Sequence, residues 1–359
     1  MAGAALHVRG VVLPEGGERD LYAVDGQLTY EPVPGAETVA DRGWVVPGLV
    51  DCHCHVGLQP AGAVPDDETL FRQASADRDA GALLLRDAGS PVDNRVVQAR
   101  EDLPRLVRAG QHIARPKRYL RDIGVEVEPA GLVAAVEEQA RLGDGWVKLV
   151  GDWIDRDTGD LAPLWPDGVL AAAVDRAHEL GVRVAVHTFA EETLPALVAA
   201  GVDTIEHATG LTGGLVDQVA RYGIRITPTL INVDTFPAIA EQAAKYPAYA
   251  AHMLALHRTA RARVRDAYEA GVRILVGSDA GGTLRHGLVV QEIRALHAAG
   301  LPAEAALAAG SWDARDFLGL PGLVEGAPAD LVVYGDDPRI DLTTLAAPTR
   351  IVLRGRVIT

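Results

Sequence analysis

Residues 45–57 read VVPGLVDCHCHVG and place two cysteines and two histidines in strict alternation at the end of an apolar run. The length and composition of GLVDCHCHV are typical of a buried strand. Side chains of a strand point alternately to opposite faces, so His53 and His55 should share one face, and Cys52 and Cys54 the other. Histidine is costly against an apolar helix layer, whereas free cysteine is often buried there. We therefore expect the imidazoles to face a site and the cysteines to pack.

An alternating pattern of predicted strands and helices covers about 270 residues, beginning with this strand. Short apolar runs alternate with Ala-rich helical runs such as PAGLVAAVEEQARLG and PDGVLAAAVDRAHELG, which end on glycine. The apolar runs are ALLLRDAG, WVKLV, VRVAVHT, DTIEHA, IRITPTLI and RILVGSDAG. Repeated strand and helix predict a parallel sheet and, with this many units, a closed (β/α)8 TIM barrel. The third strand is the least distinct and falls within PRLVRAGQHI, which contains His112.

Both ends of the chain have a different character. The first forty residues and the last forty read as short strands broken at Gly or Pro, as in LYAVDGQLTYE and TRIVLRGRVIT. We expect the two ends to form one small β-sandwich domain, residues 1–46 with 320–359, attached to a barrel of residues 47–319. An α/β barrel with such an appendage accounts for a length of 359 residues.

The charge balance excludes several kinds of partner. With 34 basic and 49 acidic residues the net charge is −15, which argues against nucleic acid and anionic membranes because both attract a basic face. No apolar run is long enough to span a bilayer, and MAGAALHVRG lacks the pattern of a signal peptide. We expect a cytoplasmic protein that acts on a small molecule; its composition leaves open whether it is a homo-oligomer.

Metal-ligand residue types recur at the ends of the later strands. Lys148 lies inside WVKLV, His187 ends VAVHT, His207 ends DTIEHA and Asp279 ends LVGSDAG. Each has an ordinary structural interpretation, such as a hydrogen-bonded histidine, a helix N-cap for Asp279, or a lysine in a buried ion pair. All of them at the rim where barrels keep their active sites, together with His53-x-His55, predict one metal-dependent catalytic site.

These motifs resemble the amidohydrolase superfamily, and most of all its branch of imidazolonepropionase and related metal-dependent hydrolases, including dipeptidases. The resemblance covers nearly the whole chain. VVPGLVDCHCHVG is similar to the family's first-strand signature, and RHGLVVQEIRALHAAGLPAEAALAAGSWDARDFLGL to the region after its last catalytic strand. GLVEGAPADLVVYGDDP resembles the return into its small β domain.

The resemblance implies a site with two divalent metal ions, with zinc the expected metal. It assigns His53, His55 and Asp279 to the more buried ion and His187 and His207 to the second. Lys148 matches the lysine that reacts with CO₂ to become a bridging carbamate, an N6-carboxylated side chain. Such a site implies that a bridging hydroxide attacks a carbonyl, while Asp279 serves as general base and then as general acid toward the leaving nitrogen.

Two further residues are candidates for contact with the substrate. Tyr119 follows the third strand in the basic segment RPKRYLRD and could donate a hydrogen bond to an oxyanion, although a solvated loop explains the segment equally well. His286, seven residues after Asp279, could face the substrate or cap the next helix. Trp153, just past Lys148, could line a pocket or simply begin a loop.

Three functions compete at this level. The first is a binuclear hydrolase that cleaves an amide-type C–N bond in a dipeptide, an N-acyl amino acid or a cyclic amide. The second is a one-metal deaminase or imidazolone-type ring hydrolase with an unmodified Lys148. The third is a non-catalytic barrel scaffold, which the six intact ligand candidates argue against. The choice of substrate lies in the loops after the strands and not in the fold.

Overall fold

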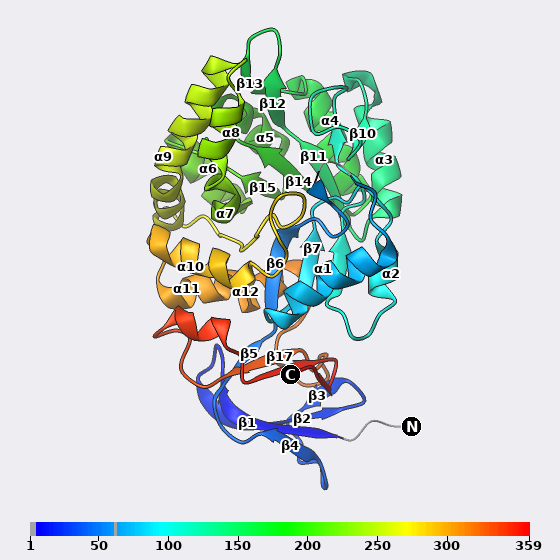
Figure 1. Cartoon of the computed structure of the whole chain (residues 1–359), viewed down its shortest axis with the longest axis vertical. Coiled ribbons are helices and arrows are strands. Elements are labelled where there is room, and N and C mark those ends of the chain that lie inside the picture. Colours follow the sequence, from blue (N-terminus) through cyan, green and yellow to red (C-terminus); the bar gives the residue numbers. More distant parts are fainter. Residues whose placement is uncertain (1–4, 61–62) are drawn as a thin grey trace.

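The computed structural model of the chain describes residues 5–60 and 63–359. Its centre is a closed barrel of parallel strands surrounded by helices, with a smaller sheet below it in Figure 1. The barrel strands are β6 (Leu49–Cys54), β7 (Ala82–Asp87), β8 (Arg105–Arg108), β9 (Ile113–Ala114), β11 (Trp146–Val150), β14 (Arg183–Thr188), β15 (Thr204–His207) and β16 (Arg225–Thr227). Residues 273–280 fill the last strand position, since Ile274 bridges to β16 and Ala280 to β6. The predicted (β/α)8 barrel is confirmed.

The third barrel strand consists of two short pieces. Strand β8 pairs with β7, and β9 pairs with β11 and with β10 (Val125–Glu126). Gly110 lies between the two pieces with φ +71°, a conformation that glycine adopts at little cost. This break explains why the sequence pattern of the third strand is indistinct.

Strand β6 departs from the simple alternation that we predicted for the cysteines. Its pairing with β7 shifts register between Asp51 and Cys54. Cys52 packs in one apolar cluster with Val50 and Leu84, whereas Cys54 belongs to the large cluster of the barrel and its helices. The prediction that the two cysteines share one face is therefore wrong, because the irregularity resets the side-chain direction within the motif.

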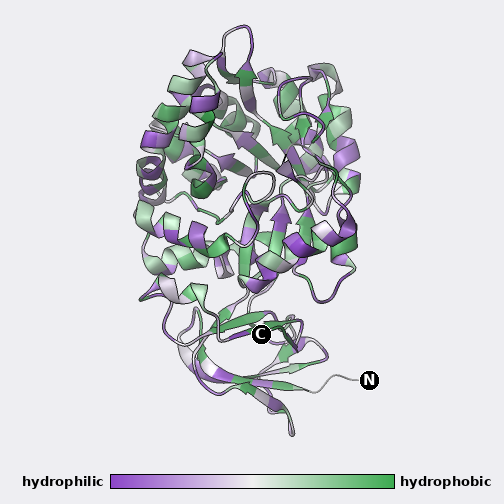
Figure 2. Cartoon of the chain, in the orientation of Figure 1, coloured by the Kyte–Doolittle hydropathy of each residue, from purple (hydrophilic) through white to green (hydrophobic). Residues whose placement is uncertain are grey.

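Helices cover the outside of the barrel (Figure 1). In Figure 2 they carry both hydrophobic and hydrophilic residues, as expected of helices with one face on the strands and one in water. The helices are α1 (Asp67–Asp79), α2 (Arg95–Gln98), α3 (Leu132–Leu142), α4 (Asp167–Glu179), α5 (Leu194–Ala200), α6 (Gly214–Tyr222), α7 (Leu230–Val233), α8 (Phe236–Gln242), α9 (Pro247–Glu269), α10 (Val289–Ala299), α11 (Ala303–Ala309) and α12 (Trp312–Leu318). A hairpin of β12 (Asp152–Asp155) and β13 (Asp160–Pro163) extends above the barrel.

The smaller sheet combines both ends of the chain, as predicted. Its strands are β1 (Leu6–Val12), β2 (Gly17–Val24), β3 (Gln27–Thr29), β4 (Glu37–Ala40), β5 (Trp44–Pro47), β17 (Leu331–Tyr334), β18 (Arg350–Leu353) and β19 (Arg356–Val357). Strand β17 pairs antiparallel with β5, which joins the C-terminal strands to the N-terminal ones. Strand β5 leads directly into β6. The terminal sheet therefore lies at the end of the barrel where its strands begin, opposite their carboxyl ends. The domain boundaries at 46/47 and 319/320 stay a prediction.

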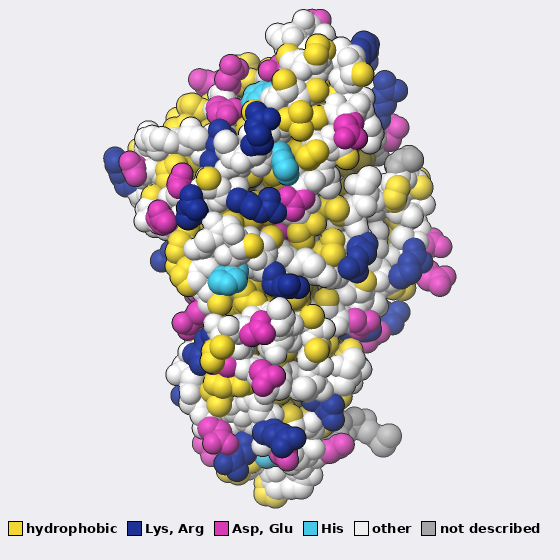
Figure 3. Space-filling view, turned by 60° about the vertical axis from the view of Figure 1, so that its left-hand side comes forward, with side chains coloured by type: hydrophobic (Ala, Val, Ile, Leu, Met, Phe, Trp, Pro, Cys, Tyr) yellow, Lys and Arg dark blue, Asp and Glu magenta, His cyan; other side chains and the backbone are white. Residues whose placement is uncertain are grey.

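The surface is mixed in charge. Figure 3 shows acidic and basic side chains interspersed over one face of the molecule. Within the described residues, no helix combines the length and the apolar character that crossing a bilayer requires.

Candidate metal centre

The six predicted metal ligands gather at the carboxyl ends of the barrel strands. His53 is in β6, His55 directly after it, Lys148 in β11, His187 in β14, His207 at the end of β15, and Asp279 in the closing segment 273–280. The imidazole rings lie close together: ring centroids are 5.0 Å apart for His53 and His207, and 4.6 Å for His187 and His207. Five of the six residues are buried, and the side chain of Asp279 is 16% exposed.

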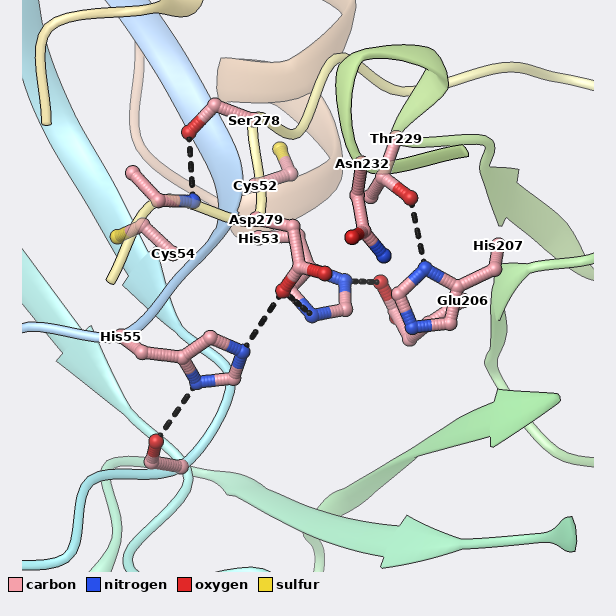
Figure 4. A network of polar contacts seen from close by, with 12 residues as sticks. Cys52, His53, Cys54, His55, Glu206, His207, Thr229, Asn232, Ser278 and Asp279 are labelled. Atoms are coloured by element: carbon pink, nitrogen blue, oxygen red, sulfur yellow. Dashed lines mark hydrogen bonds and ion pairs between the residues drawn. The ribbon is translucent and has the colours of Figure 1, made fainter. Parts of the chain in front are cut away.

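Asp279 contacts the two histidines of the HCH motif. Its Oδ1 lies 3.1 Å from His53 Nε2 and 2.9 Å from His55 Nε2 (Figure 4). Burial alone would raise the pKa of Asp279, but the two imidazoles outweigh it and hold that pKa well below the usual value. His53, His207 and Asp279 together offer ligand atoms that all lie within 4.8 Å of one another. These residues could hold a cation.

Three of the histidines use their other ring nitrogen for a hydrogen bond that points away from Asp279. His53 Nδ1 pairs with Glu206 Oε2 at 2.7 Å, and His55 Nδ1 with the carbonyl oxygen of Gly89 at 2.8 Å. His207 Nδ1 pairs with Thr229 Oγ1 at 2.7 Å, as Figure 4 shows. Metal-binding histidines generally hold their second nitrogen in this way, which fixes the ring and its tautomer. The arrangement leaves Nε2 of each ring as the nitrogen for a metal.

The backbone is strained at two of the predicted ligands. His207 has φ +67° and Asp279 has φ +56°, in the left-handed region that non-glycine residues seldom adopt. In a regular strand Glu206 and His207 would point to opposite faces. The left-handed conformation of His207 lets both side chains reach the surroundings of His53. Strain of this kind is concentrated at functional sites.

Lys148 and His187 complete the site without hydrogen-bond partners. Within the part of the chain that the structure describes, the buried Lys148 Nζ and His187 Nε2 have none. Burial lowers the pKa of Lys148 to about 8 and that of His187 well below 6.5. A neutral imidazole has a lone pair to offer a metal, and a buried amine without a partner calls for an explanation.

A buried ion pair between Arg86 and Glu206 lies next to the site and was not predicted from the sequence. Glu206 contacts His53 through Oε2 and accepts a hydrogen bond from Arg86 Nη2 through Oε1, at 2.7 Å. Arg86 also donates to the carbonyl oxygen of Cys52 at 2.6 Å and stacks over the ring of Trp146. Both side chains are almost fully buried. A charged residue within each apolar strand, ALLLRD and DTIEH, was the signal that could have revealed the pair.

We expect the replacement Arg86→Met to destabilise the protein by about 3–5 kcal/mol, because it leaves the carboxylate of Glu206 buried without its partner. Urea unfolding of the metal-free protein measures this loss. The control is Arg141→Met, which breaks the exposed pair with Glu138 and should cost less than about 1 kcal/mol. Equal midpoints for Arg86→Met and the unmodified chain would contradict the expectation.

Tyr119 lies beside the site in a group of aromatic rings, and its contact with a substrate stays a prediction. Its ring centroid is 5.5 Å from that of His187, 5.4 Å from His112 and 4.8 Å from Trp153. Burial raises the pKa of Tyr119, so its hydroxyl keeps its proton and can donate. The position of His112 was also not predicted from the sequence. Its ring stacks on that of His55, with centroids 5.0 Å apart.

His286 has a different environment. Its Nδ1 pairs with Asp77 Oδ2 of helix α1 at 2.7 Å, and the backbone N–H of Gly287 donates to the same carboxylate. This pairing fixes the segment after Asp279 to α1. Nε2 of His286 is buried and, within the described residues, without a partner. Its contact with a substrate stays a prediction.

Both cysteines are buried thiols. Burial raises the pKa of Cys52 to about 12 and that of Cys54 well above its ordinary value. The thiolate is the form that binds metals, so thiols held in their neutral form are poor ligands. Among the described residues, neither sulfur belongs to the group of donor atoms around Asp279.

Comparisons with known proteins agree on the family and the fold. The model of the amidohydrolase family matches residues 44–358. Uncharacterized protein Rv2915c of Mycobacterium tuberculosis H37Rv is 54% identical over 352 residues, which are 98% of this chain and 95% of that protein. A Xaa-Pro dipeptidase structure with bound methionine in the active site is 21% identical, with a TM-score of 0.80 and 99% of both chains covered. A prolidase complexed with N-methylphosphonate-L-proline is 22% identical, with a TM-score of 0.81 over 99% of both chains. At these identities the two structures establish a shared fold, the barrel with its terminal β-sandwich.

Proposed function

The chain belongs to the amidohydrolase family, and on that basis we propose that it is a metal-dependent hydrolase that cleaves an amide-type C–N bond of a small molecule. The candidate substrates are a dipeptide, an N-acyl amino acid and a cyclic amide. The observation that carries the proposal is the arrangement of His53, His55 and His207. Nδ1 of each of these rings is hydrogen-bonded, and the Nε2 atoms of His53 and His55 both contact Asp279.

The donor set suits two divalent ions such as zinc. His53, His55 and Asp279 would hold one ion, and His187 and His207 the other. Burial lowers the pKa of His187 and His207, which keeps both imidazoles neutral, and within the described residues Nε2 of His187 has no partner, so both fit the second ion. Bound there, the ions would supply Lewis acidity, which lowers the pKa of water and polarises a carbonyl group.

Lys148 would help to hold the metal after reaction with CO₂. The lone pair of its neutral amine forms a bond to the carbon of CO₂, a C–O π pair moves onto oxygen, and one N–H proton leaves to solvent. The product is a carboxylate on a long arm. The reaction needs a neutral amine, and burial favours that form. It would also give the unpartnered Nζ of Lys148 a function.

Asp279 would move the proton. Both of its histidine contacts use Oδ1, so Oδ2 remains to accept a proton from the attacking water. The same carboxyl group would then pass this proton to the leaving nitrogen of the substrate. Tyr119, whose hydroxyl stays protonated, would donate a hydrogen bond to the negative oxygen that develops on the substrate.

A one-metal enzyme is the second candidate. Among the described residues, the closely spaced donor group holds only His53, His207 and Asp279, a number that suits a single ion. In that case Lys148 would stay unmodified, and the reaction would be that of a deaminase or an imidazolone-type ring hydrolase.

Metal content per chain tests the proposal. We expect about two ions per chain by elemental analysis after expression with zinc and bicarbonate, and hydrolysis of members of a library of dipeptides, N-acyl amino acids and cyclic amides. About one ion, with deamination or ring opening instead, would favour the second candidate. Absence of bound metal after reconstitution would overturn both.

A further inference from the structure

His112 directly precedes strand β9, which is adjacent to the strand of Lys148. Strands β9 and β11 pair in parallel with Ile113 opposite Leu149. The residues one step earlier, His112 and Lys148, therefore lie side by side, about 4.8 Å apart across the strands. Partners in a parallel register point to the same face of the sheet, so both side chains enter the barrel interior.

The imidazole of His112 is held in place and yet has unused hydrogen-bonding groups. It is 1% exposed, and within the described residues both of its ring nitrogens lack a partner. A neutral imidazole has one N–H donor and one acceptor, so two polar atoms are buried unsatisfied. Buried polar groups nearly always have partners, which suggests that a group absent from the unmodified chain completes these bonds.

The surroundings make room for this ring. A Cβ atom at Gly89 would lie 2.8 Å from His112 Nδ1 and 3.0 Å from its Cε1, so a side chain at position 89 would collide with the imidazole. His55 stacks on the ring, and Tyr119 packs against it. The position therefore accommodates an imidazole, beside a lysine whose Nζ also lacks a partner in the part of the chain that the structure describes.

We propose that the N–H of His112 donates a hydrogen bond to the carboxylate formed on Lys148, and that His112 is in this way a positioning residue for the modified side chain. This inference rests on the proposed carboxylation of Lys148. Arg86, another buried donor nearby, already donates to Glu206, to Thr204 and to a backbone carbonyl. The ring nitrogens of His112, by contrast, have no partner among the described residues.

The test measures carboxylation directly. The full chain is reconstituted with zinc and ¹³C-labelled bicarbonate, and the carbamate signal is followed by ¹³C NMR as the bicarbonate concentration rises. His112→Phe keeps a flat ring and removes the donor. We expect this variant to need about ten to a hundred times more bicarbonate for half-maximal label, because hydrogen bonds to a charged group are strong. His112→Gln retains a donor and should recover part of the difference.

Tyr334→Phe is the control, because it removes a buried tyrosine hydroxyl from strand β17, outside the site, and leaves His112 in place. Its bicarbonate requirement should equal that of the unmodified chain, and circular dichroism verifies the fold of each variant. Equal requirements for His112→Phe and the unmodified chain would overturn the role of His112 alone. No label in the unmodified chain at any bicarbonate concentration would overturn the carboxylation of Lys148 and this inference with it. If His112→Phe does not fold, His112→Gln and His112→Leu give the same comparison of a donor with none.

Discussion

Asp279→Asn should lower kcat by about a thousandfold or more, because general acid–base catalysis contributes about 10²–10⁴-fold and the amide cannot accept and return a proton. Asparagine has the size of aspartate, and its carbonyl oxygen can still face His53 and His55, so the fold should persist. The measurement is kcat on the best substrate of the library, with metal content and thermal unfolding recorded for the same preparation.

Asp330→Asn is the control for this replacement. Asp330 is as buried as the metal-site histidines, but it pairs with Arg105 and with the backbone N–H of Arg354 below the barrel. The same chemical change there should leave kcat per folded molecule unchanged. If Asp279→Asn retained its metals and kept kcat within about tenfold of the unmodified chain, proton transfer would belong to another residue.

Lys148→Ala is expected to reduce bound metal from about two ions per chain to about one and to lower kcat by about a thousandfold, since metal ions contribute several kcal/mol to such reactions. The truncation leaves space beside His112 and His187 where the lysine arm was. A short carboxylic acid such as propionate can occupy that space and supply the missing carboxylate. Millimolar propionate should therefore restore part of the activity and the second ion.

Two variants make this result specific. Lys148→Arg fills the same space with a permanent cation, so it should lose activity and show no rescue by propionate. Lys245→Ala, which removes a lysine that lies over the ring of Tyr246, should behave as the unmodified chain. Full activity of Lys148→Ala without added acid would contradict a catalytic function of the bridge.

The alternation of short apolar runs with helical runs was enough to predict the barrel, because each strand and each helix has its own local sequence pattern. The recurrence of ligand-type residues at strand ends led to the prediction of a single cluster, and the structure brings His53, His207 and Asp279 within reach of one another. Their assignment as ligands stays a prediction. The different environments of Cys52 and Cys54 could not be predicted, since they depend on a register shift of β6 against β7 that leaves no local trace in the sequence.

The hydrogen-bond partners of the candidate ligands could not be predicted from the sequence either. Arg86 and Glu206 are 120 residues apart, and Thr229 contacts His207 from the segment between strand β16 and helix α7. Such pairs form only when the barrel closes, so no spacing within the chain predicts them. The place of His112 depends on the break of the third strand at Gly110, where the pattern was least distinct.

The pairing of β17 with β5 has a consequence for the nascent chain. Strand β5 ends at Pro47 and its antiparallel partner β17 begins at Leu331, so the whole barrel is synthesised between the two strands. At about 5–20 residues per second, the edge of β5 stays open for on the order of 15–60 s. An unpaired strand edge of this kind invites pairing with other chains, and the sequence WVVP carries no charge to prevent it. The residues of the barrel are thus synthesised while this edge of the sheet is still without its partner strand.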